Sequence, residues 1–175
     1  MSTRPQEIIE FWITEPMRRH WFRSSARLDA EIRQRFETVW KQAASGALSA
    51  WRQTALGSLA LAIVLDQFPL NMYRGQARAF ATEAQSIEVA LHAIGLGFER
   101  QLPGEQQAFL YMPLMHSENP QHQDRSVRLF EAAGLESNAR FARHHRDLIR
   151  RFGRFPHRNQ ILGRPSTAEE RVYLA

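Results

Sequence analysis

Cysteine is absent from the 175 residues of this chain. A chain without cysteine forms no disulfides and has no thiolates to hold zinc or an iron–sulfur cluster. Lysine is nearly absent too, since Lys41 is the single lysine among 23 basic residues and the others are arginine. The formal net charge of +5 alone would suit a nucleic-acid-binding protein. Because such surfaces usually contain lysine as well as arginine, we expect no nucleic-acid partner.

Long hydrophobic runs are also missing. A membrane-spanning helix needs about 18 or more consecutive apolar residues, and no such run occurs. The longest apolar stretch, ALGSLALAIVL from Ala55 to Leu65, predicts a buried core helix. The N-terminal segment lacks the uninterrupted apolar region of a secretory signal peptide. We therefore expect a cytoplasmic protein without a membrane partner.

No segment alternates apolar and polar residues for long enough to predict a strand. Apolar residues instead recur at spacings of three and four, as they do on one face of a helix. Leu28, Ile32 and Phe36 begin the clearest such stripe, and we predict a helix there with Asp29 as its N-cap and Gly46 after its end. The other predicted helices cover 54–67 with an end at Pro69, 79–96, a segment from Pro103 interrupted at Pro113, 121–133, 137–152, and a short stretch capped by Ser166 or Thr167.

Short connections between these helices favour antiparallel helical hairpins. Hydrophobic residues make up 43% of the chain, with eleven Phe and four Trp, which is enough for a packed core. The aromatic residues near the N-terminus, Phe11, Trp12, Trp21 and Phe22, predict core packing. We expect one all-α domain over residues 1–175.

Three segments interrupt the helical pattern with polar residues: LDQFPLNMYRG at 65–75, YMPLMHSENPQHQ at 111–123 and RRFGRFPHRNQILGR at 150–164. The first and third both carry Phe-Pro followed by an asparagine. A residue before proline tends to leave the helical conformation, and helix ends expose carbonyls that arginine or asparagine can satisfy. The simplest interpretation of these loops is therefore helix capping.

Together the three segments resemble a bacterial family of unknown function, domain of unknown function 924 (DUF924). The resemblance runs from about Ile8 to Leu174, and its last motif, FGRFPHRNQILGRPSTAEERVYL, is long and specific. It implies an all-helical fold of the tetratricopeptide type and no established reaction. Family members usually carry a basic residue where this chain has Leu70 and an acidic one where it has His122. The positions that match the family are Asp66, Gln67, Asn71, Arg74, His116, Ser117, Glu118, His145, Arg154, His157, Arg158, Asn159 and Arg164.

A pocket for a small anion is the first functional hypothesis. The planar guanidinium of arginine binds carboxylates and phosphates through two parallel hydrogen bonds. Buried arginines must be paired, so inward-facing arginines here need either Glu118 and Asp66 or the anionic group of a ligand. We predict that the ligand-binding residues are Asp66, Gln67, Asn71, Arg74, His145, Arg154, His157, Arg158, Asn159 and Arg164.

An enzyme is the second hypothesis. His116 and Glu118 place an imidazole and a carboxylate in one short segment, and histidine acts readily as an acid or a base near neutral pH. These two residues are the predicted catalytic pair, for hydrolysis or acid–base chemistry on an anionic substrate. Ser117 lacks the G-x-S-x-G surroundings of a hydrolase nucleophile. The same His-Ser-Glu run could equally cap a helix end.

Two further classes remain. A metal site is not expected, because no H-E-x-x-H pattern occurs and the adjacent His144 and His145 would point about 100° apart on a helix. No cofactor is expected either. A concave helical-repeat surface that binds a protein or a peptide is the remaining alternative, and the sequence does not decide between these hypotheses.

Overall fold

The computed structural model describes residues 3–23 and 25–175, and every regular element in these residues is a helix. The predicted all-α fold is therefore confirmed. The α-helices are α1 (Pro5–Ile13), α2 (Ala26–Ala44), α3 (Ala55–Ala62), α4 (Phe68–Met72), α5 (Glu83–Gly95), α6 (Gly104–Met115), α7 (Pro120–Ala132), α8 (Glu136–Phe152) and α9 (Ala168–Leu174). Short 3-10 helices are η1 (Met17–His20), η2 (Ser49–Gln53), η4 (Ala77–Phe80), η5 (Phe98–Gln101) and η6 (Pro156–Arg158), and η3 (Ile63–Gln67) is a π-helix.

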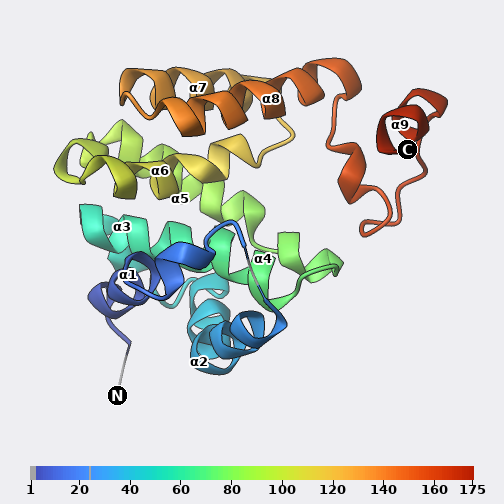
Figure 1. Ribbon diagram of the computed structural model, residues 1–175. Coiled ribbons are helices and arrows are strands. Elements are labelled where there is room, and N and C mark those ends of the chain that lie inside the picture. The colour runs from blue at the N-terminus through green and yellow to red at the C-terminus, as the bar shows by residue number, and fades with distance from the viewer. Residues whose placement is uncertain (1–2, 24) are drawn as a thin grey trace.

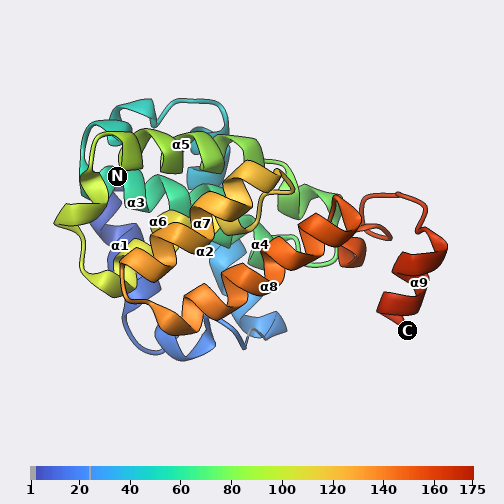
Figure 2. The same cartoon turned by 90° about the horizontal axis from the view of Figure 1, so that it is seen from above.

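The helices stack in layers (Figures 1 and 2). Helices α7 and α8 pack against each other on one side, α5 and α6 lie beneath them, and α3 separates these from α1 and α2. Helix α9 lies beyond the C-terminal end of α8, apart from the layers. The closer likeness to a tetratricopeptide array stays a prediction.

The predicted core helix lies at the centre of this stack. The stretch Ala55–Met72 is long and apolar enough to cross a membrane, but 83% of it is buried inside the protein. Around it, the rings of Trp12, Phe68 and Phe109 meet edge to face at centroid distances of 5.6–5.7 Å, a favoured aromatic geometry. Its hydrophobic surface is therefore covered by other parts of the same chain.

Helix α2 begins earlier than predicted. Its N-cap is Ser25, whose Oγ accepts a hydrogen bond from the Leu28 N–H at 3.3 Å. The prediction of Asp29 as the N-cap is wrong, because Asp29 lies in the first turn. Its carboxylate accepts hydrogen bonds from Arg74 instead. The short last helix does begin at Thr167 as predicted, with Glu170 completing a capping box.

The predicted helix end at Pro69 is also wrong. The chain passes from α3 through the π-helix η3 into α4, which contains Pro69. Proline has no N–H to donate to the carbonyl four residues earlier, and here the hydroxyl of Thr82 donates to that Leu65 carbonyl at 2.6 Å. A side chain from the start of α5 thus replaces the missing backbone donor, and the helix continues.

Helix α6 likewise continues through Pro113, where an interruption was predicted. All eight residues from Ala108 to Met115 are buried. Burial of one large apolar side chain contributes roughly 1.5–3 kcal/mol, whereas a proline inside a helix costs about 3 kcal/mol. Several buried side chains therefore outweigh one proline, and α6 continues to His116 at its C-cap.

Candidate functional site

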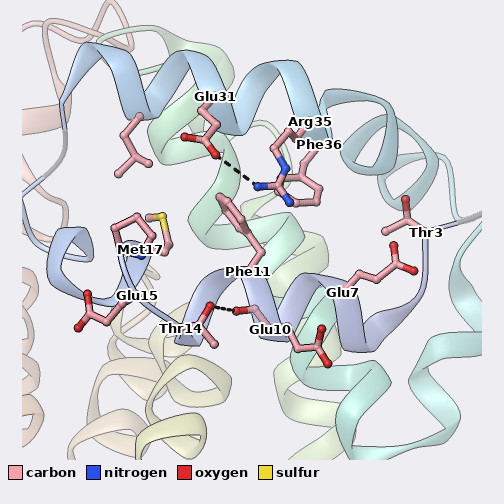
Figure 3. Close-up of a pocket in the computed structure, with 12 residues that line it drawn as sticks. Thr3, Glu7, Glu10, Phe11, Thr14, Glu15, Met17, Glu31, Arg35 and Phe36 are labelled. Carbon is pink, nitrogen blue, oxygen red and sulfur yellow. Dashed lines mark hydrogen bonds and ion pairs between the residues drawn. The ribbon is translucent and has the colours of Figure 1, made fainter.

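A large open cleft of about 720 Å³ lies between α1 and α2 (Figure 3). Four glutamates and Arg35 line it together with apolar residues such as Phe11. Arg35 forms an ion pair with Glu31 at 3.3 Å and lies 4.4 Å from the centre of the Phe11 ring. None of the predicted site residues lies here, and its charged groups are exposed at the surface, so we do not place the functional site in this cleft.

A second pocket, of about 270 Å³, brings several of the predicted site residues together. It lies between α4, α6, α8 and the connection after η1. The predicted residues in its wall are Gln67, Asn71, Arg74, His116 and His145. The other lining residues are Trp21, Phe22, Leu70, Met112, Met115, Asn138 and Phe141. The pocket therefore combines a polar group of side chains with a mainly apolar wall, as small-molecule sites commonly do.

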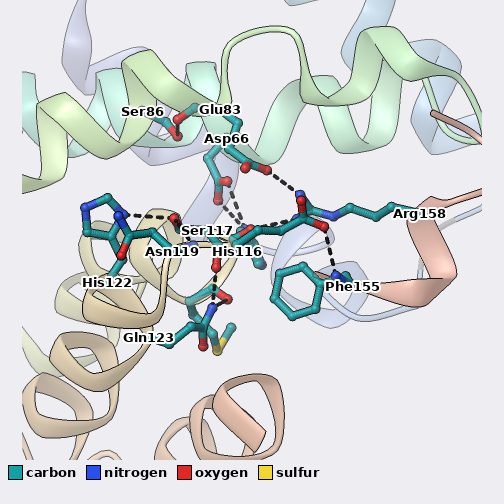
Figure 4. A network of polar contacts seen from close by, with 12 residues as sticks. Asp66, Glu83, Ser86, His116, Ser117, Asn119, His122, Gln123, Phe155 and Arg158 are labelled. Atoms are coloured by element: carbon teal, nitrogen blue, oxygen red, sulfur yellow. Dashed lines mark hydrogen bonds and ion pairs between the residues drawn. The ribbon is translucent and has the colours of Figure 1, made fainter. Parts of the chain in front are cut away.

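His116 is held at this pocket by a buried carboxylate. Its Nδ1 lies 2.9 Å from Oδ1 and 3.0 Å from Oδ2 of Asp66 (Figure 4). Asp66 is buried, and its other hydrogen bond comes from the side-chain amide of Gln67 at 2.7 Å. An ionised carboxylate only accepts hydrogen bonds, so Nδ1 carries the proton and neutral His116 keeps its lone pair on Nε2. Nε2 has no hydrogen-bond partner among the described residues.

The π-helix places the Asp66 carboxylate. The Phe68 N–H donates to the Ile63 carbonyl, five residues back, so this hydrogen bond spans one more residue than the bonds of an α-helix. Such π segments occur often at functional sites. Here η3 carries Asp66 and Gln67 at its last two positions, and both side chains reach towards the end of α6.

His145 reaches the same pocket from α8. Its Nδ1 lies 2.8 Å from the carbonyl of Phe141, which can only accept, so Nδ1 donates. Burial lowers the pKa of His145 to about 4, although the bond to Phe141 opposes this shift. The ring centres of His116 and His145 are 6.4 Å apart. The pocket thus contains two imidazoles of different character, one anchored on a carboxylate and one kept neutral by burial.

Arg74 and Asn71 provide polar groups from α4 and the residues after it. Arg74 donates from Nε and Nη2 to Asp29 at 2.8 and 3.2 Å, and from Nη2 to Asn71 at 3.1 Å. The Asn71 amide donates to the Gln67 carbonyl one turn earlier. These bonds hold the Arg74 guanidinium at the pocket and leave its Nη1 without a bond to any described residue.

The arginine-rich stretch 150–164 lies away from this pocket, and each of its three predicted ligand-binding arginines has a carboxylate partner within the chain. Arg154 binds both oxygens of Glu170 at 2.7 and 2.8 Å. Arg164 binds both oxygens of Glu118 at 2.8 and 2.9 Å. These ion pairs satisfy the guanidinium groups within the chain, which is the alternative to a bound anion that the sequence left open.

Arg158 makes the most buried of these contacts. It is 5% exposed and donates to Glu83 and to the His116 carbonyl, both at 2.7 Å (Figure 4). Its guanidinium lies between the rings of Phe80 and Phe155, 4.4 and 4.8 Å from their centres, a cation–π geometry. Arg158 therefore links the C-terminal segment to the backbone of His116.

The remaining predicted residues support the same segment. Asn159 is buried and donates to Ser166 and Glu170. His157 is exposed, with its ring 5.6 Å from that of Phe155. Neither lines the pocket.

Glu118, predicted to work with His116, does not contact it. Besides Arg164 it accepts the Phe155 N–H at 2.8 Å, and hydrogen bonds from these two groups together lower the pKa of Glu118 although burial opposes them. Asp66 takes the place beside His116. Ser117 lies in the turn between α6 and α7, where its Oγ is 2.8 Å from His122 and accepts the Asn119 N–H (Figure 4). Ser117 therefore stabilises the turn before Asn119, which is the N-cap of α7.

Sequence reasoning missed the apolar wall of the pocket. Trp21 and Phe22 were interpreted as core, yet Phe22 is 76% exposed at the pocket, as is Phe141 at 58%. The one signal for Phe141 is its position on a strongly basic helix, where an exposed aromatic residue is unusual. No group of three or more histidine and acidic side chains within residues 3–23 and 25–175 is arranged to hold a metal ion.

Comparison with known proteins supports the family but names no activity. A solved structure of ATU0120, a protein of unknown function from Agrobacterium tumefaciens, superposes with a TM-score of 0.92 at 38% identity, covering 97% of this chain and 96% of that one. No curated protein matches the chain. The family model described as a bacterial protein of unknown function, DUF924, matches residues 8–175. The chain therefore belongs to the DUF924 family.

Proposed function

We propose that this protein is an acid–base enzyme that acts on a small organic anion bound in the pocket between α4, α6 and α8. The observation that carries this proposal is the pair formed by His116 and Asp66, in which a pocket imidazole is held by both oxygens of a buried carboxylate. The pair resembles the arrangement in which a carboxylate orients a catalytic histidine and stabilises its protonated form.

The chemistry follows from the positions of the protons. Neutral His116 presents the Nε2 lone pair as a base, and the charge that develops on the ring when it takes a proton is offset by Asp66 beside it. The Gln67 amide holds the other side of Asp66, so the carboxylate stays in place during the transfer. His145 donates from Nδ1, so its Nε2 lone pair can accept a hydrogen bond from a hydroxyl or a water molecule and orient it.

Arg74 and Asn71 supply the binding group for the anion. Arg74 is ion-paired with Asp29 through Nε and Nη2, and we assign the anion to the Nη1 donor that this pair does not use. A hydrogen bond from a charged group is worth about 1.5–3 kcal/mol. This interpretation keeps the small-anion hypothesis but moves it from the arginine-rich stretch to α4. It also replaces Glu118 by Asp66 as the partner of His116.

The test starts from binding. Small carboxylates and phosphates are screened by thermal shift, where a ligand at about 100 times its Kd should raise Tm by roughly 5–10 °C. The Kd of each hit is then measured for wild type, Arg74→Gln and the matched exposed-residue control Arg128→Gln. We expect Arg74→Gln to weaken binding about tenfold or more and Arg128→Gln to leave it unchanged.

Turnover is measured on the same ligands. Each hit is incubated with the protein in D₂O and in H₂¹⁸O, and its mass is followed, because proton abstraction from carbon exchanges deuterium and hydrolysis incorporates oxygen. The mass of the ligand should change with wild type and should not change with His116→Gln. The control His92→Gln replaces an exposed histidine on α5 and should behave like wild type. If a ligand binds at the pocket and its mass does not change with wild type, the protein binds this ligand without catalysing a reaction on it, and the enzymatic proposal is wrong.

A further inference from the structure

The pocket does not end at its apolar wall. A second hollow of about 190 Å³ shares four lining residues with it, Trp21, Phe22, Met112 and Asn138. Its other walls are Ala108 and Phe109 on α6, Leu135 before α8, and Glu105. The shared residues place the two hollows next to each other along α6 and the N-terminal half of α8, and we take the two together as one groove.

The chemical character of the groove changes along its length. Every imidazole in its walls, together with Arg74, Gln67 and Asn71, lies in the first hollow. The second hollow is apolar except for Asn138 at the boundary and Glu105. Glu105 forms an ion pair with Arg18 at 2.7 Å, so this end already holds a neutralised carboxylate and offers nothing to a second anionic group. A molecule that fills the groove therefore carries one polar end and one apolar end.

The exposed aromatic residues fit the same occupant. Phe22 and Phe141 stand at the groove with 76% and 58% of their surface exposed. Large apolar side chains gathered at the surface commonly mark a binding site, and contact with an apolar chain would remove their surface from water. The flexible thioethers of Met112 and Met115 line the first hollow, and methionine adapts its shape readily to a bound chain.

We infer that the substrate is a single-headed organic anion with a linear apolar tail, its head beside Arg74 and His116 and its tail between Phe22, Phe109 and Leu135. This inference rests on the proposed function, which supplies the head-binding site, and adds the class of molecule. A tail of successive methylene groups fits because the second hollow adjoins the first and is lined mainly by apolar side chains. Each methylene buried in the groove should tighten binding about threefold to fourfold.

The experiment is a chain-length series measured on the full chain. Kd values are determined for butanoate, hexanoate and octanoate, and for the alcohols of the same lengths, all below their aggregation concentrations. We expect Kd to fall about tenfold or more from each carboxylate to the next, since each step adds two methylenes. Binding of octanoate should shift the NMR methyl signals of Leu135 and Ala108, whereas butanoate should shift only those of Met112 and Met115.

A groove variant provides the control. Leu135→Asp places a charge at the tail end, and we expect it to weaken octanoate binding at least tenfold while leaving butanoate binding unchanged. Its folding is checked by circular dichroism and Tm, and Leu135→Ala, which removes a tail contact in the second hollow only, repeats the test if Leu135→Asp is unfolded. Both variants leave His116 and Arg74 in place.

The outcomes separate the two proposals. If the carboxylates bind with the same Kd at every length and lose affinity in Arg74→Gln, the proposed tail site is wrong and the proposed anion pocket is supported. Alcohols that tighten with length while carboxylates do not bind would support the groove and overturn the anion head group. No binding by either series would overturn both.

Discussion

At the scale of single residues, the pocket is built from side chains whose protons are held in place. Asp66 fixes the proton of His116 on Nδ1, and the Phe141 carbonyl fixes that of His145. The two imidazoles differ because one faces a buried carboxylate and the other faces aromatic and aliphatic neighbours, with the Phe155 ring 5.4 Å away. This difference has a consequence for stability that does not depend on any ligand.

Protonation of His145 should destabilise the fold. Burial lowers the pKa of His145 in the folded protein to about 4, below the value of about 6.5 in an unfolded chain. The unfolded state therefore binds the proton more readily, so the stabilisation is complete above about pH 6.5 and is lost as the pH falls towards 4. We expect the free energy of unfolding in urea to fall by roughly 2–3 kcal/mol between pH 7 and pH 4 from this group.

His145→Gln isolates this contribution. The variant should lose the His145 contribution to the pH dependence between pH 6.5 and 5, where most carboxylates stay ionised. Burial also lowers the pKa of His122, and this contribution has the same sign in wild type and variant, so it cancels in the comparison. Equal slopes of stability against pH in the two proteins would show that His145 is not protected from water as described.

At the scale of elements, the junction between α3 and α4 depends on a donor from another helix. The Thr82 hydroxyl donates to Leu65 at 2.6 Å and accepts the Trp40 indole N–H at 3.0 Å. All three groups are buried. Through this one hydroxyl, α2 and the start of α5 both hold the π-helix that carries Asp66.

Thr82→Val should therefore weaken the fold more than an ordinary loss of a hydroxyl. It leaves the Leu65 carbonyl and the Trp40 N–H without their partner, and a buried unsatisfied group costs about 1–3 kcal/mol. We expect a loss of roughly 2–4 kcal/mol in urea unfolding at constant m value. The control is Thr14→Val, whose hydroxyl bonds the Glu10 carbonyl at the surface and should change stability by less than about 0.5 kcal/mol. Similar losses in both variants would contradict this role of Thr82.

At the scale of the whole molecule, the C-terminal segment 154–175 is attached mainly by ion pairs. Helix α9 lies apart from the layers (Figures 1 and 2). A small apolar cluster of Leu148, Ile149 and Phe155 joins the segment to α8, and the Phe152 and Tyr173 rings meet at 5.2 Å. Glu118 holds it through Arg164 and the Phe155 N–H. The arginine-rich stretch therefore binds the turn after His116 through the Glu118 carboxylate.

Glu118→Gln should loosen this segment selectively. Loss of the carboxylate leaves Arg164 with weaker partners, and a contribution of about 1–3 kcal/mol corresponds to a rise of roughly 5- to 150-fold in local amide exchange. Hydrogen exchange should accelerate over 154–174 and stay unchanged in α3 and α6. Glu88→Gln, which removes an exposed carboxylate paired with Arg52 at 3.6 Å, serves as the matched control. Unchanged exchange over 154–174 in Glu118→Gln would show that Glu118 does not hold this segment in place.

The sequence by itself determined the helical class and most of the helices. An apolar stripe at spacings of three and four can be recognised within one segment, without knowledge of what packs against it. It also singled out Asp66, Gln67, Asn71, Arg74, His116 and His145 as unusual polar residues. Their separation along the chain says nothing about distance: Asp66 and His116 are 50 positions apart and in contact.

Only the tertiary structure decided which of these residues meet. Pro69 is tolerated because the Thr82 hydroxyl replaces the missing N–H donor, and Pro113 because burial of the α6 side chains outweighs its cost. The arginines that suggested an anion site are each matched by a carboxylate distant in sequence, as Arg158 is by Glu83. Charge pairing and burial depend on three-dimensional neighbours, and for this reason the partner of His116 was the acid on the π-helix and not the one two residues away.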